Sequence, residues 1–240
     1  MIKLSSFHCR APFCVLLVCL AMVSQAFTEE IRRVDYVLDP GHSPLSPGAT
    51  SCTGKSEYRY NDSLTETIKL AFEKRQFAVG ITRQANEDIP LIGRAQSAKG
   101  KKFILSIHHD SVQPQYIVWK RKGVPTSLKA QGFSIFVSKK NSHYKQSLNY
   151  AQNLGKALVK RGLKPTLHHA EKIAGENRQL IDPEHGIYLF DDLVVLKNSD
   201  APAVLLEAAV IVHPKDENRA SSAAYKSLIS EAVIEMALSI

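Results

Sequence analysis

The sequence predicts a single α/β domain with a mostly parallel twisted sheet flanked by helices on both faces. Short apolar runs alternate with segments of helical periodicity along most of the chain, an order typical of parallel sheets with helical crossovers. Three of the four cysteines lie near the N-terminus, and only Cys52 follows them. No disulfide can therefore form within the main part of the chain, which must fold on a hydrophobic core.

Five segments are predicted as strands because they are short and rich in apolar residues: 33–38, 77–82, 103–107, 133–138 and 203–206. Helical spacing predicts helices over 63–74, 90–98, 142–161 and 220–238. Two further stretches, 110–131 and 164–190, lack such regularity and are long for plain connections. We expect them to form substrate walls or a lid.

The N-terminal residues have the pattern of an export signal. Lys3 and Arg10 give a positive start to the uncharged, mainly apolar run 11–23, which is shorter than the ~20 residues of a membrane-spanning helix. Small residues at positions 24 and 26 suit cleavage by a signal peptidase. We therefore expect a signal peptide over 1–26 and one domain over 27–240.

The chain is basic, with a formal net charge of +8. This excess suits an anionic partner such as a cell-wall polymer or a membrane surface. The charges are spread along the chain, as on an ordinary solvated surface, and no nucleic-acid-binding motif accompanies them. We therefore expect no nucleic-acid partner.

Residues capable of metal binding or proton transfer follow three of the predicted strands. His42 comes shortly after the first strand, His108 and His109 directly after the third, and Glu207 directly after the last. Ligands of open α/β sheets gather beyond the carboxyl ends of strands. Glu57 lies in a Gly- and Ser-rich segment that a loop could fold back to the same edge. Two imidazoles and one carboxylate, with a fourth position open to water, form a catalytic zinc arrangement.

Each of these residues also has an ordinary interpretation. A histidine after a strand is more often a hydrogen-bonding residue than a ligand, and Glu57 alone could be a surface carboxylate. This interpretation fits Glu207 less well, because a carboxylate buried beside an apolar strand requires a hydrogen-bond or charge partner, or has a functional role.

Four blocks of sequence resemble the zinc-dependent N-acetylmuramoyl-L-alanine amidases, the family that includes the bacterial cell-separation amidases. The blocks are Val37 to His42 with Gly48, Gly54 and Glu57; Thr82-Arg83, Asp88 and Ile89-Pro90-Leu91 with Arg94 and Ala98; Ser106-Ile107-His108; and Pro202 to Glu207. They occur in the family's order and span nearly the whole chain after the leader.

By position, the resemblance implies that His42, Glu57 and His108 bind one Zn²⁺ and that Glu207 is the catalytic residue. It implies a peptidoglycan hydrolase that cleaves the amide between N-acetylmuramic acid and L-alanine of the stem peptide by zinc-activated water. We expect a monomer in the periplasm, with secretion as the alternative, and a possible protein activator is left open. Other possible functions are a non-catalytic cell-wall binding protein with the same fold, and a zinc peptidase or deacetylase acting on another wall bond.

The chain departs from the family pattern after His108. Many relatives have Ala-Asn or Ala-Asp there, whereas this chain has His109-Asp110. Because side chains alternate across a strand, only one of the two histidines can face a given site. We assign the metal to His108 and give His109 a role in supporting the ligands or facing the substrate.

The two irregular stretches carry further candidates. Trp119 could stack on a sugar or belong to an ordinary surface loop. In the stretch 164–190, Glu176 or Arg178 is expected to face the cleft. His168 and His169 lie there too, but they lack a compact ligand pattern, so a polar loop is favoured over a second metal site.

Overall fold

The computed structural model describes residues 35–120 and 123–239, and the predicted signal peptide lies outside these ranges. Among the described residues, no helix has the length and apolar character needed to cross a membrane.

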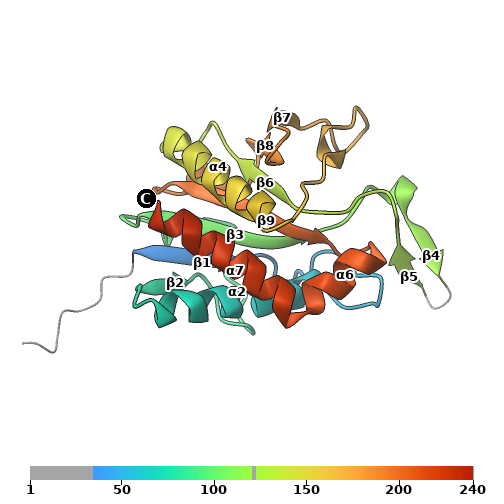
Figure 1. Ribbon diagram of the computed structural model, residues 1–240, viewed down its shortest axis with the longest axis horizontal. Coiled ribbons are helices and arrows are strands. Elements are labelled where there is room, and N and C mark those ends of the chain that lie inside the picture. The colour runs from blue at the N-terminus through green and yellow to red at the C-terminus, as the bar shows by residue number, and fades with distance from the viewer. Residues whose placement is uncertain (1–34, 121–122, 240) are drawn as a thin grey trace, which may run out of the picture. The chain divides into compact units, whose positions relative to one another are not determined.

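A seven-stranded mixed sheet forms the centre of the domain, with the strand order β2-β1-β3-β9-β6-β8-β7 (Figure 1). Its strands are β1 (Tyr36–Pro40), β2 (Val79–Ile81), β3 (Phe103–Asp110), β6 (Ser134–Val137), β7 (Gln179–Asp182), β8 (Ile187–Leu189) and β9 (Ala203–Val210). Neighbours are parallel except for the pairs β6–β9 and β7–β8. The prediction of a mostly parallel sheet is confirmed.

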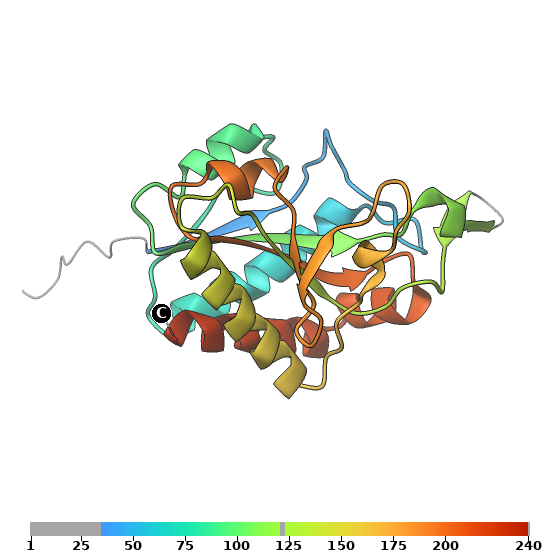
Figure 2. The same ribbon diagram turned by 90° about the horizontal axis from the view of Figure 1, so that it is seen from above.

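Helices cover both faces of the sheet (Figure 2). One face carries α2 (Glu57–Lys74), α4 (Tyr144–Lys160) and α7 (Ala223–Leu238), and the other carries the shorter α3 (Leu91–Gln96) and α5 (Val194–Asn198). Helix α2 buries Leu64, Ile68 and Phe72, whose spacing of four residues places them on one side of the helix. The largest apolar cluster therefore lies between the sheet and the three long helices.

The remaining elements are short. They are α6 (Pro214–Ser221), the 3₁₀ helices η1 (Pro114–Tyr116) and η2 (His168–Ala170), and the hairpin of β4 (Val118–Lys120) and β5 (Val124–Thr126). The hairpin projects from one end of the domain (Figure 1). It belongs to the first of the stretches predicted to be irregular, while β7 and β8 belong to the second.

Three predicted boundaries are wrong in a way that affects the candidate site. Strands β3 and β9 continue to Asp110 and Val210, so His108, His109 and Glu207 lie within strands and not after them. The backbone pairing continues through these polar positions, which apolar patterning cannot detect. Helix α2 likewise begins at Glu57 and not at 63, so this residue lies in the first helical turn and not in a loop. The helix predicted over 220–238 is interrupted at Ser222, whose hydroxyl caps α7.

Candidate metal centre

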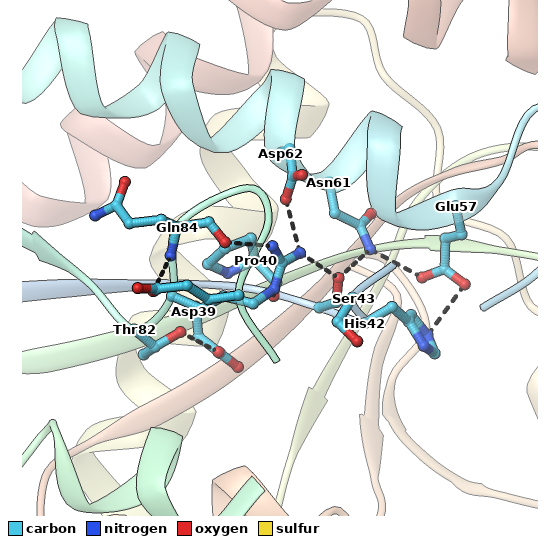
Figure 3. A network of polar contacts seen from close by, with 12 residues as sticks. Asp39, Pro40, His42, Ser43, Glu57, Asn61, Asp62, Thr82 and Gln84 are labelled. Atoms are coloured by element: carbon cyan, nitrogen blue, oxygen red, sulfur yellow. Dashed lines mark hydrogen bonds and ion pairs between the residues drawn. The ribbon is translucent and has the colours of Figure 1, made fainter. Parts of the chain in front are cut away.

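The structure brings His42, Glu57 and His108 together, and we call them the first metal group. They come from the turn after β1, the first turn of α2 and strand β3. Nε2 of His42 lies 3.1 Å from Oε2 of Glu57 (Figure 3), and Nδ1 of His108 lies 3.1 Å from Oε1. One ligand atom from each residue lies within 4.8 Å of the others. Two imidazole nitrogens and a carboxylate oxygen at this spacing can hold a divalent metal ion.

Glu57 is held in place by backbone and side-chain donors. Oε2 accepts a hydrogen bond from the amide of Ala49 at 3.0 Å, and Oε1 accepts one from Nδ2 of Asn61 at 3.1 Å (Figure 3). Burial favours the neutral acid, but the hydrogen bonds and charges of His108 and His42 outweigh it and hold the pKa of Glu57 far below its usual range. The carboxylate is therefore ionised, as a metal ligand must be.

Two glycines of the first sequence block allow the ligands to approach one another. A Cβ atom added to Gly41 would overlap the imidazole of His108, and one added to Gly48 would meet Glu57 and His42. Gly48 also has a φ of +73°, which side chains other than glycine rarely adopt. The spacing of this block therefore reflects close packing around the ligands.

Two buried arginines from the second block hold the turn that carries His42. Arg94 donates hydrogen bonds to the carbonyl oxygens of Pro40 at 2.9 Å and His42 at 3.0 Å. Arg83 donates to the carbonyl of Pro40 at 3.1 Å and to the carboxylate of Asp62 at 2.7 Å. The main chain on both sides of Gly41 is thus fixed by the protein itself.

Replacing Arg83 with methionine is expected to lower the free energy of unfolding by about 3 kcal/mol or more, because it removes one partner of a buried charged network. Arg83 is only 2% exposed, so water cannot replace its hydrogen bonds. Urea denaturation would measure the change. The matched control is Arg75→Met, which removes the exposed pair with Glu231 and should cost less than about 1 kcal/mol. Equal losses in both variants would contradict this role for Arg83.

His109 points away from the first metal group. Its ring is 2% exposed and packs against Tyr60, with ring centroids 5.5 Å apart, and its Nδ1 lies 2.8 Å from Oδ1 of Asn61. Burial lowers the pKa of His109 to about 3, so the ring is neutral. A substrate-facing role is excluded by this burial. Instead His109 orients Asn61, which in turn donates to Glu57.

Glu207 lies beside His108 in the sheet. The two residues are register partners on the parallel strands β3 and β9, so their side chains leave the same face of the sheet. Oε2 of Glu207 is buried and has no hydrogen-bond partner among the described residues. Burial, with the nearby carboxylates of Asp110 and Glu57, raises the pKa of Glu207 well above its usual range. Such a carboxyl group is suited to proton transfer.

Two cavities beside these residues share Leu193 and Leu205 in their linings, and we call the two together the cleft. The larger, of about 330 Å³, is lined by both histidines of the first metal group and by mainly apolar residues of α3 and α5. The smaller, of about 240 Å³, is lined by Glu207 and by residues of β3 and the 164–190 segment. His42 and His108 thus line one half of the cleft, and Glu207 lines the other.

The 164–190 segment forms part of the cleft wall, as the sequence predicts. Both Glu176 and Arg178 line the smaller cavity with Glu207. Trp119 does not contribute to the cleft wall. It is 65% exposed on the β4–β5 hairpin and lines neither half of the cleft.

The preference for a polar loop over a second metal site in this segment stays a prediction, but two of its histidines lie close to a carboxylate at the end of β3. Asp110, His168 and His169 present ligand atoms within 4.8 Å of one another, and we call them the second metal group. The sequence did not reveal this group because His169 is 59 positions from Asp110. Its members meet only because η2 packs at the end of β3.

An α/β domain with a His/Glu/His group and a buried glutamate at the carboxyl ends of parallel strands has the architecture of a metal-dependent hydrolase. Residues 37–238 match the N-acetylmuramoyl-L-alanine amidase family, so the chain belongs to this family.

Individual relatives agree with this assignment. The chain is 29% identical over 201 residues to the probable cell wall amidase LytH of Staphylococcus saprophyticus, in an alignment covering 83% of this chain and 55% of that protein. It therefore spans about half of that relative's length. It is 23% identical over 228 residues to the N-acetylmuramoyl-L-alanine amidase AmiA of Escherichia coli, covering 85% of this chain and 74% of the relative.

The fold is shared with solved amidase structures. The N-acetylmuramyl-L-alanine amidase Ami1 of Mycobacterium smegmatis superimposes with a TM-score of 0.67 at 19% identity, covering 88% of this chain and 98% of that structure. At this level of identity the likeness concerns the fold alone.

Proposed function

We propose that this protein hydrolyses the amide bond between N-acetylmuramic acid and L-alanine of the stem peptide in peptidoglycan. The observation that carries the proposal is a His/Glu/His group next to Glu207, the register partner of His108, whose Oε2 has no hydrogen-bond partner among the described residues. Membership of the amidase family supports the choice of bond. The names of the staphylococcal and E. coli relatives support a cell-wall substrate.

The proposed cofactor is one Zn²⁺ held by His42, Glu57 and His108. Two imidazoles and a carboxylate match the ligands of catalytic zinc, with a further position left for water. When bound, zinc supplies Lewis-acid activation of water and of the amide carbonyl. The ionised state of Glu57 and the packing around Gly41 favour this assignment.

Glu207 is the proposed proton-transfer residue. Its carboxylate takes a proton from the attacking water and then donates it to the nitrogen of L-alanine as the amide bond breaks. A raised pKa suits the second step, because the protonated form must persist near neutral pH until the nitrogen leaves.

The residues that line the two halves of the cleft support a peptide-bearing sugar polymer as the substrate. The half lined by α3 and α5 is mainly apolar, whereas the half containing Glu207 also contains Arg178. We assign the 164–190 segment to the substrate-side wall, where Arg178 can meet a carboxylate of the stem peptide. Export by the 1–26 leader, with the periplasm as destination, would bring the enzyme to this substrate.

Digestion of purified peptidoglycan, with products identified by mass, tests the proposed reaction. Intact stem peptides that begin with L-alanine should appear, and treatment with a chelator should abolish their release until zinc is restored. Cleaved cross-links or deacetylated glycan would instead indicate a zinc peptidase or deacetylase. Binding to the polymer without any product would indicate a non-catalytic wall-binding protein.

A further inference from the structure

The second metal group has the geometry of a closely packed ligand set. Oδ2 of Asp110, at the end of β3, lies 2.9 Å from Nε2 of His169 and 3.4 Å from Nε2 of His168. Both histidines belong to η2, in the segment that forms the cleft wall. For comparison, the nitrogen–oxygen contacts in the first metal group are 3.1 Å. The two groups are therefore equally compact.

The other ring nitrogens of the two histidines are already held by oxygen atoms. Nδ1 of His168 lies 2.9 Å from Oγ1 of Thr166, and Nδ1 of His169 lies 2.9 Å from Oε2 of Glu176. Gln113 donates a hydrogen bond to Glu176 at 3.0 Å and fixes it in turn. Histidines that bind metals almost always donate their second N–H to an oxygen in this way, which orients the ring. Both Nε2 atoms are thereby directed at Asp110.

The two histidines differ in how fully their ring nitrogens are paired. His169 has a carboxylate oxygen at each ring nitrogen, Asp110 at Nε2 and Glu176 at Nδ1, both at 2.9 Å. His168 is 7% exposed, and its buried Nε2 has no hydrogen-bond partner among the described residues. In the tautomer whose Nδ1–H donates to Thr166, the Nε2 lone pair and the Asp110 carboxylate, 3.4 Å apart, face each other as two acceptors. A cation between them removes this conflict.

We propose that Asp110, His168 and His169 bind a second divalent transition-metal ion, and that zinc is the ion. Two imidazole nitrogens with one carboxylate oxygen favour zinc over calcium or magnesium, which prefer oxygen ligands. The ion ties η2 to the end of β3. It thereby fixes the wall segment that places Glu176 and Arg178 beside Glu207. Its role is to position this wall, separately from the reaction at the first metal group.

Metal stoichiometry of the purified protein tests the proposal without relying on activity. After zinc loading and removal of unbound metal, elemental analysis should give two zinc ions per chain for the wild type. His168→Ala and His42→Ala should each lose one ion, and the double variant should lose both. The matched control is His185→Ala, which lies in the same segment but pairs with Asp182 at 2.8 Å and should retain two ions.

One ion in the wild type, unchanged by His168→Ala and lost in His42→Ala, would overturn the second site and leave the proposed amidase centre intact. A titration of metal-free wild type with Co²⁺ gives the same answer without any variant. Visible absorption of bound Co²⁺ should saturate at two equivalents. Saturation at one equivalent would reject the proposal even if His168→Ala failed to fold.

Discussion

Replacing Glu207 with glutamine is expected to lower turnover of peptidoglycan by about 10²- to 10⁴-fold, the usual contribution of a general acid–base residue. Glutamine keeps the size of the side chain on β9 but cannot exchange a proton at neutral pH. Zinc content should not change, because Glu207 is not part of the first metal group. Release of stem peptides, measured by mass at saturating substrate, checks the rate, and elemental analysis checks the metal.

The same variant should make the stability of the metal-free fold less sensitive to a rise in pH. The pKa of Glu207 is raised on folding, so its contribution to stability is present at low pH and is lost as pH rises through the folded-state pKa. Urea denaturation of metal-free protein across this range should show a smaller decline for Glu207→Gln than for wild type. The control is Glu184→Gln at an exposed position, which should resemble wild type in rate and stability. Full activity in Glu207→Gln would reject the proposed role.

Replacing His42 with alanine is expected to abolish peptidoglycan cleavage and to remove the zinc of the first metal group. Loss of a ligand should weaken binding by more than the roughly 10- to 100-fold typical of residues that only orient ligands. Zinc affinity, measured by competition with a chelating dye, and product release should fall together. The domain should remain folded by circular dichroism, because Arg83 and Arg94 hold the turn through main-chain carbonyls.

His109→Ala is the matched comparison, because it changes the neighbour of His108 without removing a ligand. The zinc stoichiometry of the first metal group should persist, with affinity reduced by no more than about 100-fold. The free energy of unfolding should fall by about 1–3 kcal/mol, because Oδ1 of buried Asn61 loses its hydrogen bond with the His109 ring. Loss of stoichiometric zinc in His109→Ala would show that His109, and not its neighbour His108, binds the metal. Retention of zinc in His42→Ala would show that His42 is not a ligand.

The sequence predicts those parts of the fold in which local pattern and tertiary packing agree. Helices α2, α4 and α7 have apolar faces at regular spacing, and β1, β3 and β9 contain short apolar runs. Strand β7 was missed because it is a partly exposed strand of mixed residues at the edge of the described sheet, where it pairs with β8. Such a strand is defined by its neighbour's hydrogen bonds and not by its own composition.

The candidate site shows the same division. His42, Glu57, His108 and Glu207 could be proposed because each lies in a recognisable block of sequence, and three of them lie at or near the end of an apolar strand. The second metal group could not, because no local pattern relates the end of β3 to a 3₁₀ helix far along the chain. The helical position of Glu57 was missed for a similar reason: its segment is rich in Gly and Ser, and no side-chain hydrogen bond caps the helix at Ser56.

The two arginines that bind the carbonyls around Gly41 have a consequence for metal exchange. Their hydrogen bonds involve protein groups alone, so the ligand turn is preorganised before any ion arrives. In zinc fingers, by contrast, binding free energy is used to fold the chain. An ion bound by the first metal group would meet three ligands that the fold already holds together, so no folding step should limit its association rate. Other first-row metals could enter the same site, so the metal found in the native protein should depend on which ions its compartment supplies.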